Sequence, residues 1–239
     1  MLESSTLSNM NAARDELKRL IENEVFVQNK DEQIELYENP DAWLFDFRRI
    51  LLQGRPAQLV SDLFYEKFRD VYPFQIGTLE SAGIPLLTSL MNTLYSKGHS
   101  DINTFFIRKS RKKSGLFRIV EGTISKSKKI ILVDDIMNSG DSLWKQVIIL
   151  ESLGYTVDTV WTILKFRSDS YYKRFTDRNI TVESLFSLEE FRHSFPAVTS
   201  FLNGPEQPLQ TPFTIQWLFK GGKPTYKYIV QKSQPALDE

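Results

Sequence analysis

Runs of apolar residues, separated by polar turns, predict a set of buried strands in the middle of the chain. Four consecutive apolar residues, Ile130 to Val133, are typical of a strand that is covered on both faces, as in a parallel sheet. Further strands are predicted at Tyr72 to Ile76, Thr104 to Ile107 and Thr156 to Leu164. Because apolar residues at helical spacing lie between these runs, the pattern indicates an α/β fold with a mostly parallel sheet.

Two helices are predicted within this region from the same kind of pattern. Residues Pro56 to Arg69 place large apolar side chains on one face, which is typical of a helix that packs on a core. These side chains are Leu59, Leu63, Phe64 and Phe68. A second helix is expected to begin near Leu143 and to end at Gly154, a residue type that commonly stops helices.

The flanking regions carry weaker patterns. Residues 1–40 are polar with a narrow apolar stripe, so we predict a helical extension, capped by Ser8 or Asn9, that packs on the outside of a core or on a partner. Residues 41–195 form the predicted central domain, in which Ala42 to Arg48 alternate as a strand does and Tyr171 to Phe191 are mostly helical. Residues 196–239 form a C-terminal extension. Its strands, Phe213 to Lys220 and Thr225 to Val230, are joined as a hairpin across Gly221-Gly222.

Composition narrows the possible functions. The 239 residues include 30 basic and 30 acidic side chains, so no net charge points to nucleic acid or to a membrane surface as a partner. Cysteine is absent and there are two histidines, which excludes disulfides, thiolate zinc sites and multi-histidine metal sites. No apolar run approaches the ~20 residues of a membrane span, and the N-terminus does not resemble a signal peptide. These features predict a soluble, cytoplasmic protein.

The chemistry of the chain is concentrated just after the strand at Ile130 to Val133. Asp134 and Asp135 follow that strand, and then come a polar turn with Gly140 and the predicted helix. A helix start offers unpaired N–H groups and a partial positive charge to a phosphate. The two carboxylates can bind neighbouring hydroxyl groups or hold a hydrated Mg²⁺ ion. The stretch therefore predicts a phosphosugar site, although a strand–turn–helix connection with an Asp cap is common in any α/β protein.

This stretch resembles the phosphoribosyl diphosphate (PRPP) signature of type I phosphoribosyltransferases. That signature has a hydrophobic strand, two acidic residues, two variable residues, small polar residues, a Gly and a closing Ser or Thr. The matching positions are Ile130 to Val133, Asp134 and Asp135, Ile136 and Met137, Asn138 and Ser139, Gly140, and Ser142. Asp141 departs from the signature, which prefers Gly, Thr or Ala there. Its carboxylate either caps the following helix and points away from a ligand, or faces the phosphate and weakens binding.

The resemblance covers roughly residues 43 to 168 and is greatest to orotate phosphoribosyltransferases. It implies a twisted, mostly parallel sheet flanked by helices, with a small hood, and a homodimer. It also implies transfer of phosphoribose from PRPP to a nucleobase, with Mg²⁺ and release of diphosphate. In this family Asp134 and Asp135 would bind the ribose hydroxyls and the metal through water or ligand. The loop Asn138 to Ser142 would hold the 5-phosphate.

Two further segments resemble the diphosphate side of these enzymes. The loop Thr78 to Leu86 resembles a small-residue loop before Gly-Ile-Pro-Leu, which implies diphosphate contacts from Glu80, Ser81, Ala82 and Gly83. Ala82 stands where the family often has Lys, and an ordinary strand–turn–helix connection explains the segment equally well. The basic run from Arg108 to Gly115 resembles a loop that crosses the dimer. Arg108, Lys109 and Lys112 would neutralise diphosphate, although a charge run by itself is usually a solvated loop.

Within that basic run, Ser110 and Ser114 replace the family's Glu and His. Losing the His removes a possible proton carrier from the loop, which spans residues 108–121 in the implied dimer. For the base, the resemblance implies Arg167, which follows the strand ending at Leu164; a surface arginine is the alternative. Arg48 and Phe45 are the hood residues assigned to the base.

Two other functions fit parts of the pattern. A non-catalytic protein of the same fold could bind PRPP or a nucleotide and regulate a partner, which the departures at Ala82, Ser114 and Asp141 favour. A phosphorelay receiver domain has a similar acidic first strand. Receivers begin with that strand, however, and they need a phospho-accepting Asp after a later strand, where this chain offers Lys165.

Overall fold

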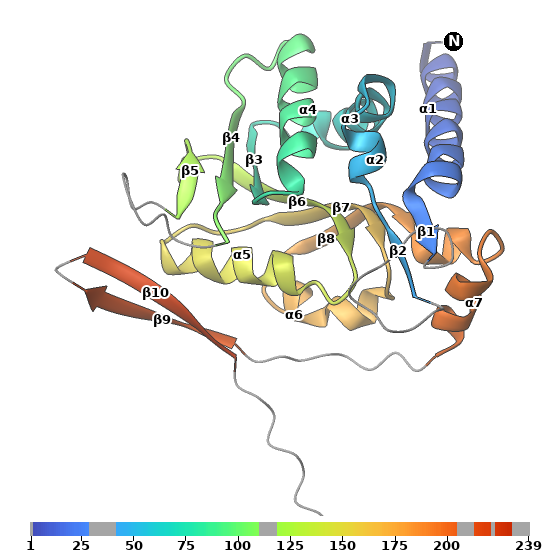
Figure 1. Ribbon diagram of the computed structural model, residues 1–239. Coiled ribbons are helices and arrows are strands. Elements are labelled where there is room, and N and C mark those ends of the chain that lie inside the picture. The colour runs from blue at the N-terminus through green and yellow to red at the C-terminus, as the bar shows by residue number, and fades with distance from the viewer. Residues whose placement is uncertain (1, 29–41, 110–118, 205–212, 221–222, 231–239) are drawn as a thin grey trace, which may run out of the picture.

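A six-stranded sheet forms the centre of the protein (Figure 1). The computed structural model describes residues 2–28, 42–109, 119–204, 213–220 and 223–230. In spatial order the strands are β5 (Val120–Gly122), β4 (Asn103–Ile107), β3 (Phe74–Leu79), β6 (Lys129–Met137), β7 (Thr159–Lys165) and β8 (Thr181–Ser187). All neighbours pair in parallel except β5, which runs antiparallel to β4. The predicted α/β class with a mostly parallel sheet is therefore confirmed.

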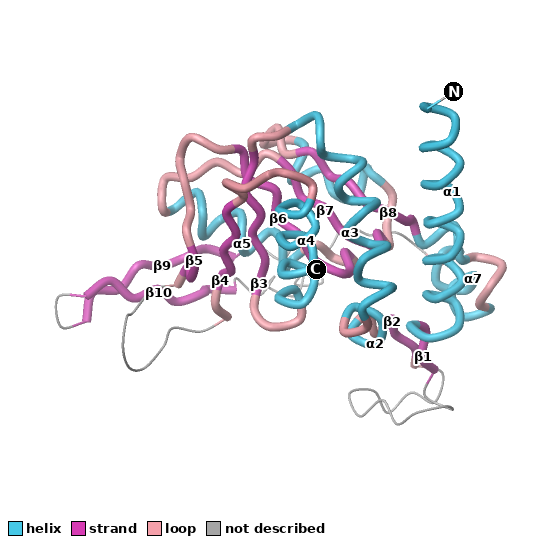
Figure 2. The backbone as a smooth tube through the Cα atoms, turned by 90° about the horizontal axis from the view of Figure 1, so that it is seen from above, coloured by secondary structure: helices cyan, strands magenta, loops and turns pink. Residues whose placement is uncertain are grey.

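Helices cover both faces of this sheet (Figures 1 and 2). On one face lie α1 (Leu2–Leu20), α2 (Arg48–Leu51), α3 (Gly54–Phe68) and α4 (Gly83–Ser96). On the other face lie α5 (Asp141–Ser152) and the short α6 (Lys173–Thr176). No helix in the described part of the chain is long and apolar enough to cross a bilayer.

The strand β6 shows why the sheet needs helices on both sides. Ile131 and Val133 pack into the cluster beneath α3 and α4, whereas Ile130 and Leu132 pack into the cluster beneath α5. All four side chains are at most 1% exposed. Because successive side chains of a strand point to opposite faces, an unbroken apolar run fits a strand with a core on each side. The prediction from this run is confirmed.

The helix predictions in the central region also agree with the structure. In α3, the four predicted apolar residues are all at most 6% exposed. The helix α5 ends one residue before Leu153, and Gly154 follows with a left-handed φ of +79°. The N–H of Gly154 donates to the carbonyl of Glu151, so Gly154 stops the helix as predicted.

Two predictions of secondary structure are wrong. The first helix does not begin after Ser8 or Asn9 but at Leu2, and both polar residues lie exposed within it. The segment from Tyr171 to Phe191 is not mostly helical, because it contains the sixth strand, β8. Pairing with β7, from Thr159 opposite Thr181 to Lys165 opposite Ser187, stabilises this strand despite its weak local pattern.

The ends of the chain add three smaller parts. β1 (Phe26–Gln28) and β2 (Trp43–Phe45) form an antiparallel pair, and the π-helix Ile21–Val25 links it to α1. Near the C-terminus, α7 (Pro196–Asn203) precedes β9 (Phe213–Lys220) and β10 (Lys223–Val230), which pair antiparallel as the hairpin pattern predicts.

Aromatic side chains join the β1–β2 pair to the sheet. Phe26 stacks on Phe195 with ring centroids 3.7 Å apart, and Trp43 stacks on Phe166 at 6.0 Å. Phe166 directly follows β7, so this cluster fixes the N-terminal ribbon next to the carboxyl end of the sheet. Leu17, Ile21 and Val25 are fully buried in the same core, so the N-terminal stripe is part of the main core.

Candidate active site

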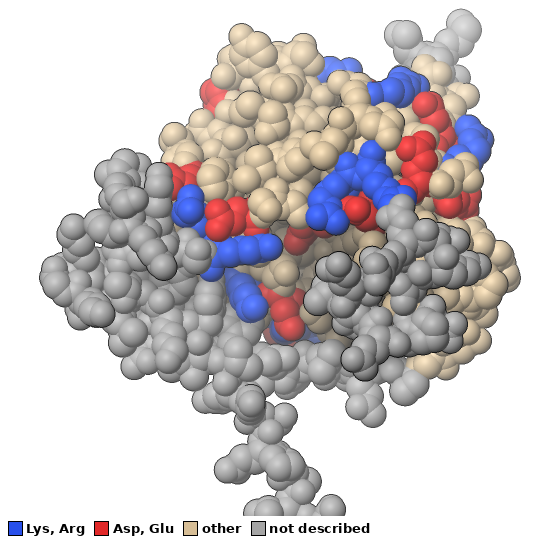
Figure 3. Space-filling view, viewed as in Figure 1, with Lys and Arg blue, Asp and Glu red and all other residues tan. Residues whose placement is uncertain are grey.

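The site lies where the direction of the sheet connections reverses. From β3 the chain passes through α4 to β4 on one side, and from β6 it passes through α5 to β7 on the other side. β3 and β6 are neighbours, so the loops that follow them diverge and leave a crevice at their carboxyl ends. Figure 3 shows a hollow on this face of the molecule with basic and acidic side chains around it.

Asp134 and Asp135 lie inside β6 rather than after it, because the pairing with β7 continues to Met137 opposite Lys165. Both side chains are half-buried. Asp134 Oδ1 accepts a hydrogen bond from the N–H of Asp135 at 3.0 Å, and Asp135 Oδ1 accepts one from Ile136 at 2.9 Å. Within the described ranges, neither carboxylate forms an ion pair with an arginine or a lysine. Among the described residues the doublet is therefore held by backbone N–H groups and by a hydrogen bond between its two carboxyl groups, not by a cation.

Burial changes the acidity of both carboxyl groups. Loss of solvent raises the pKa of Asp134 well above its usual value, and the neighbouring charge of Asp135 raises it further. The positive charge of Lys109 acts in the opposite direction on the pKa of Asp134. Burial also raises the pKa of Asp135. Two carboxylates that share a poorly hydrated position without a cation favour a bound cation or a hydroxyl-rich ligand.

The loop after the doublet forms an open cradle of backbone N–H groups. Gly140 precedes α5 with a left-handed φ of +74°, which turns the chain sharply from β6 into the helix. In the described part of the chain, no acceptor pairs with four N–H groups at this turn. These groups belong to Ser139, Gly140, Ser142 and Leu143. Asn138 and Ser142 are exposed beside them. The arrangement can accept an anion at a helix start.

The position of Asp141 differs from both sequence alternatives. The helix begins at Asp141 itself, slightly before the predicted start near Leu143, so the Asp141 carboxylate is not the cap of a helix that starts later. Asp141 Oδ1 instead accepts a charged hydrogen bond from Arg174 Nη1 at 2.9 Å. The second nitrogen of Arg174 donates to the carbonyl of Ser139 at 2.6 Å. The departure from the family signature is therefore accompanied by a counter-charge.

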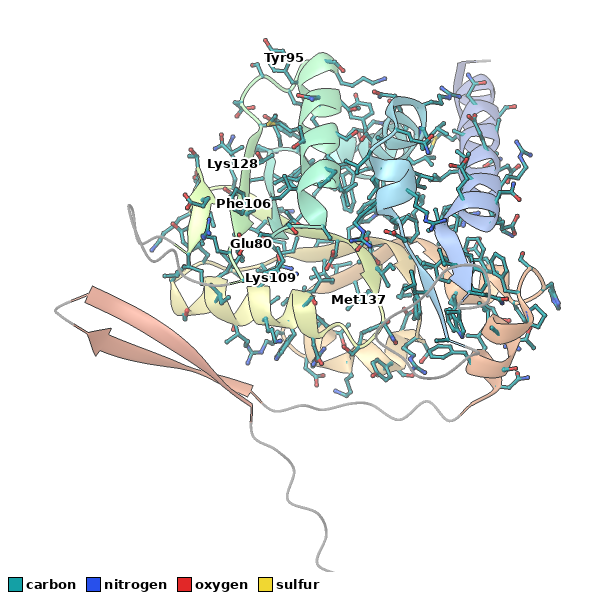
Figure 4. All side chains as sticks on the ribbon, in the orientation of Figure 1. Glu80, Tyr95, Phe106, Lys109, Lys128 and Met137 are labelled. Atoms are coloured by element: carbon teal, nitrogen blue, oxygen red, sulfur yellow. The ribbon has the colours of Figure 1, made fainter. Side chains whose placement is uncertain are left out.

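The loop after β3 carries the predicted diphosphate residues. Glu80 accepts a hydrogen bond from the backbone N–H of Lys109 at 2.7 Å, which ties the ends of β3 and β4 together (Figure 4). Ser81 is exposed, and the peptide bond between Glu80 and Ser81 is cis. A Cβ at Gly83 would lie 1.9 Å from Thr78 Oγ1, so the absence of a side chain at Gly83 serves the packing of α4 against β3. Ala82 supplies no charge.

The basic run leaves the sheet at the end of β4. Arg108 Nη1 lies 3.9 Å from Glu80 and 3.8 Å from Glu121, and Lys109 is exposed. The N–H of Arg108 donates to the carbonyl of Ile119, so the run returns to the sheet at β5. Lys112, Ser110 and Ser114 lie outside the described residues. The structure thus brings Arg108, Lys109 and Glu80 to the same sheet edge as the acidic doublet.

The three predicted base residues occupy different surroundings. Arg167 follows β7, lies over the ring of Phe201 at 4.1 Å, and donates from Nε to Asn138 Oδ1 at 3.3 Å. It borders a cavity of about 410 Å³ between the ends of β7 and β8 and α7. Arg48 is exposed, and its pKa is raised by the hydrogen bond and charge of Asp46 and, less, by Asp135. Phe45 is 4% exposed among other aromatic rings, so this structure leaves it little surface for a base.

Sequence reasoning missed two residues that hydrogen-bond to the loop between β6 and α5. Tyr172 is fully buried, and its hydroxyl donates to the carbonyls of Met137 at 2.7 Å and Asn138 at 2.9 Å. Arg174 donates hydrogen bonds to Asp141 and to the carbonyl of Ser139 in the same loop. Both come from the connection between β7 and β8, some 35 residues along the chain. No local signal in the sequence marks them, since their partners are mostly backbone carbonyls.

Comparison with known proteins shows which class of enzymes has this fold. No protein-family model matches the chain. The orotate phosphoribosyltransferase of Corynebacterium glutamicum (strain R) is 32% identical over 152 residues, which cover 64% of this chain and 79% of the relative. Orotate phosphoribosyltransferase of Mycobacterium tuberculosis H37Rv, solved with Fe(III) dicitrate, has a TM-score of 0.62 at 23% identity, covering 74% of this chain and 98% of that one. The same enzyme solved with PRPP has a TM-score of 0.57 at 21% identity, covering 75% and 91%.

The parallel sheet with a helix-start loop behind an acidic doublet is the architecture of the type I phosphoribosyltransferases. Within that class, the chain belongs to the orotate phosphoribosyltransferase family, and with it to the phosphoribosyltransferase class of enzymes. The predicted family is confirmed. The receiver-domain alternative is wrong, because the chain belongs to a different family. The comparisons also do not favour the non-catalytic alternative.

Proposed function

We propose that the protein transfers phosphoribose from PRPP to an orotate-like nucleobase and releases diphosphate. A ring nitrogen of the base forms a bond to C1 of the ribose as the bond from C1 to the diphosphate oxygen breaks. The electron pair of the broken bond leaves with diphosphate, and the ring nitrogen gives up its proton to diphosphate or to water. Positive charge develops on the ribose and negative charge on the leaving group. The site therefore has to stabilise charge rather than supply a nucleophile.

One observation carries this proposal: the acidic doublet has no cation partner within the described ranges and lies beside an open cradle of N–H groups. Asp134 and Asp135 would bind the ribose hydroxyls and stabilise the positive charge on the sugar. The loop from Asn138 to Ser142 would bind the 5-phosphate through its N–H groups and the helix start. That a relative was solved with PRPP supports the same ligand here.

The diphosphate would lie on the other side of the doublet, toward the ends of β3 and β4. Arg108, Lys109 and Lys112 would neutralise it, together with the backbone of Ser81, Ala82 and Gly83. Because Ala82 brings no charge, the basic run has to supply the positive charge on this side. Arg167 is the proposed base residue, since it lies at the end of the next strand beside a cavity of suitable size.

A Mg²⁺ ion fits the donor set of the doublet. The described residues contain no cluster of three or more acidic or histidine side chains, so the protein alone does not form a complete cage. Two carboxylates would hold the ion together with water and ligand oxygens, which is the usual arrangement for Mg²⁺ on phosphate substrates. When bound, the ion supplies neutralisation of the diphosphate charge. The raised pKa values of Asp134 and Asp135 fit a position that such a cation would stabilise.

A homodimer is part of this proposal, with the loop of residues 108–121 shared between the two subunits. The loop leaves and re-enters the sheet at its β4–β5 edge, which is compatible with a contact outside its own subunit. Size-exclusion chromatography with light scattering tests this part by itself. A monomer at assay concentration would remove the shared loop from the mechanism.

The function is tested by incubating the protein with PRPP, Mg²⁺ and a panel of pyrimidine and purine bases, while both diphosphate and nucleotide are followed. We expect equal amounts of the two products with an anionic pyrimidine such as orotate. PRPP binding without either product would favour a non-catalytic PRPP-binding protein. The absence of binding would contradict the proposed site.

A further inference from the structure

One arginine outside the family's motifs holds the phosphate loop by two of its groups. Arg174, on α6, donates from Nη1 to Asp141 Oδ1 at 2.9 Å and from Nη2 to the carbonyl of Ser139 at 2.6 Å. Its side chain is 19% exposed and that of Asp141 is 31% exposed, so the pair lies partly out of solvent. These two contacts bracket Gly140, the residue at which the loop turns into α5.

The guanidinium of Arg174 is itself fixed by packing. Its central carbon lies 5.3 Å from the ring centre of Trp144 and 5.4 Å from that of Phe175. A Cβ at Gly140 would lie 3.2 Å from Arg174 Nη2 and 3.2 Å from the Phe175 ring, so the arginine packs directly against the turn. An arginine held between aromatic rings and two acceptors is preorganised, so its side chain loses little conformational entropy when it forms these hydrogen bonds.

The charge of Asp141 makes this contact important for a phosphate ligand. Asp141 is the first residue of α5, at the helix end where a phosphate would bind. A free carboxylate there would compete for the partial positive charge of the helix and repel a phosphate dianion. The bond to Arg174 offsets that charge and keeps the carboxylate on the α6 side of the loop. The Ser139 carbonyl, bound by the same arginine, is also kept on that side, while the N–H groups of Ser139, Gly140, Ser142 and Leu143 have no acceptor among the described residues.

We infer that Arg174 is a positioning residue for the 5-phosphate, which makes an acidic residue tolerable in the phosphate loop. This inference rests on the proposed function. It adds that Asp141 and Arg174 act as a unit, so the effect of removing the arginine depends on whether the aspartate is present. An arginine that only stabilises α6 would not show this dependence.

The test is a double-mutant cycle of wild type, Arg174→Ala, Asp141→Ala and the double variant, in which the affinity for ribose 5-phosphate is measured by titration calorimetry with the full-length protein. Arg174→Ala is expected to raise the dissociation constant about tenfold or more, because Asp141 is then uncompensated. In the Arg174→Ala/Asp141→Ala protein we expect the constant to return to within about threefold of wild type. Arg174→Lys, which keeps the charge but not the fork, should fall between these values.

The matched control is Arg178→Ala. Arg178 also lies over Trp144, at 4.7 Å, and pairs with Glu151 on α5, whereas within the described residues no hydrogen bond or ion pair joins it to the loop. We expect this variant to bind ribose 5-phosphate as wild type does, and in turnover assays we expect Arg174→Ala to raise KM for PRPP with little change in kcat.

Wild-type affinity in Arg174→Ala would overturn the inference, and so would a double variant that binds as weakly as Arg174→Ala. If Arg174→Ala does not fold, Arg174→Lys decides: weaker binding of ribose 5-phosphate than in wild type would support the inference, and wild-type affinity would overturn it. Failure of the wild-type protein to bind ribose 5-phosphate or PRPP would instead contradict the proposed function, and with it the phosphate site.

Discussion

Two acidic positions on the same strand–loop–helix segment are treated in opposite ways. Asp134 and Asp135 are half-buried in β6, are bound by backbone N–H groups and have raised pKa values, without an ion pair in the described ranges. Asp141, a few residues later, has a salt bridge to Arg174. The negative charge of Asp141 is therefore offset by an arginine, whereas the doublet has no such partner among the described residues.

The difference is the one that the proposed function requires between carboxylates that face a ligand and a carboxylate that does not. A protein gains nothing in stability from two neighbouring carboxylates that lack a cation and are partly out of solvent. Such an arrangement is maintained where a ligand or metal completes it. Asp141 lies where an anion would bind and has its charge offset by the protein itself. In the proposed function the doublet is thus the binding feature, whereas the pair of Asp141 and Arg174 supports the loop beside it.

The largest effect is expected from the doublet. Asp134→Asn should lower kcat by roughly 10²–10³-fold, because a group that stabilises developing charge is lost. Asp135→Asn should have an effect of similar size. Steady-state assays of nucleotide formation with PRPP and Mg²⁺ measure both values. Activity within threefold of wild type in both variants would show that the doublet is not part of the reaction.

The next largest effect is expected at Lys112, whose positive charge would neutralise the diphosphate. Lys112→Ala should lower turnover by about 10²-fold while it changes PRPP affinity far less, because its charge is used mainly as the leaving group departs. Turnover and calorimetric affinity are compared for the same preparation. Equal losses in both would argue against a role of this loop in the transition state.

Substitution of Asp134 by Asn, which should lower activity, should raise the stability of the ligand-free protein. Because folding raises the pKa of Asp134, the folded protein holds a proton that the unfolded chain has lost, and stability falls as pH rises through the folded-state pKa. Asp134→Asn should therefore raise Tm at pH 7.5 by a few degrees, with the gain shrinking toward about pH 4.

Thermal melts of the ligand-free wild type and of Asp134→Asn across this pH range check the sign. A lower Tm for the variant at pH 7.5 would mean that the carboxylate has a stabilising partner in solution. That result would remove the contrast with Asp141.

The smallest effect is expected at Asp141. Asp141→Asn should lower stability by about 0.2–1 kcal/mol, since partly exposed ion pairs contribute little. The loss should be present at neutral pH and should decrease as salt is added. Denaturant unfolding at low and high ionic strength measures it. A gain in stability would show that the carboxylate of Asp141, like those of the doublet, destabilises the folded protein.

Much of the fold follows from local patterns in the sequence. The strand at Ile130 to Val133 is buried on both faces, as its apolar run predicts, and α3 presents its apolar face to the core. Strand β8 was missed because Thr181 to Ser187 is mostly half-buried at the sheet edge and mixes polar with apolar residues. Its pairing with β7 decides the structure, and pairing between distant segments is not visible in a local pattern.

The same limit applies to the site. The doublet and the glycine turn lie in one stretch of sequence, so their spacing alone predicts them as candidate site residues. Arg174 and Tyr172 reach the same loop from another connection of the sheet, and their partners are carbonyl groups that every residue has. The two alternatives for Asp141 both overlooked an arginine 33 positions away. Supporting residues of this kind require the three-dimensional structure.

The central claim is that the doublet lowers the stability of the ligand-free protein and binds a phosphoribosyl ligand. The most direct measurement is the PRPP dissociation constant, in the presence of Mg²⁺, of wild type and of the Asp134→Asn/Asp135→Asn variant, with the ligand-free Tm of both. We predict that the variant binds PRPP at least about tenfold more weakly and melts at a higher temperature. Equal affinity, or weaker binding together with a lower Tm, would contradict the account.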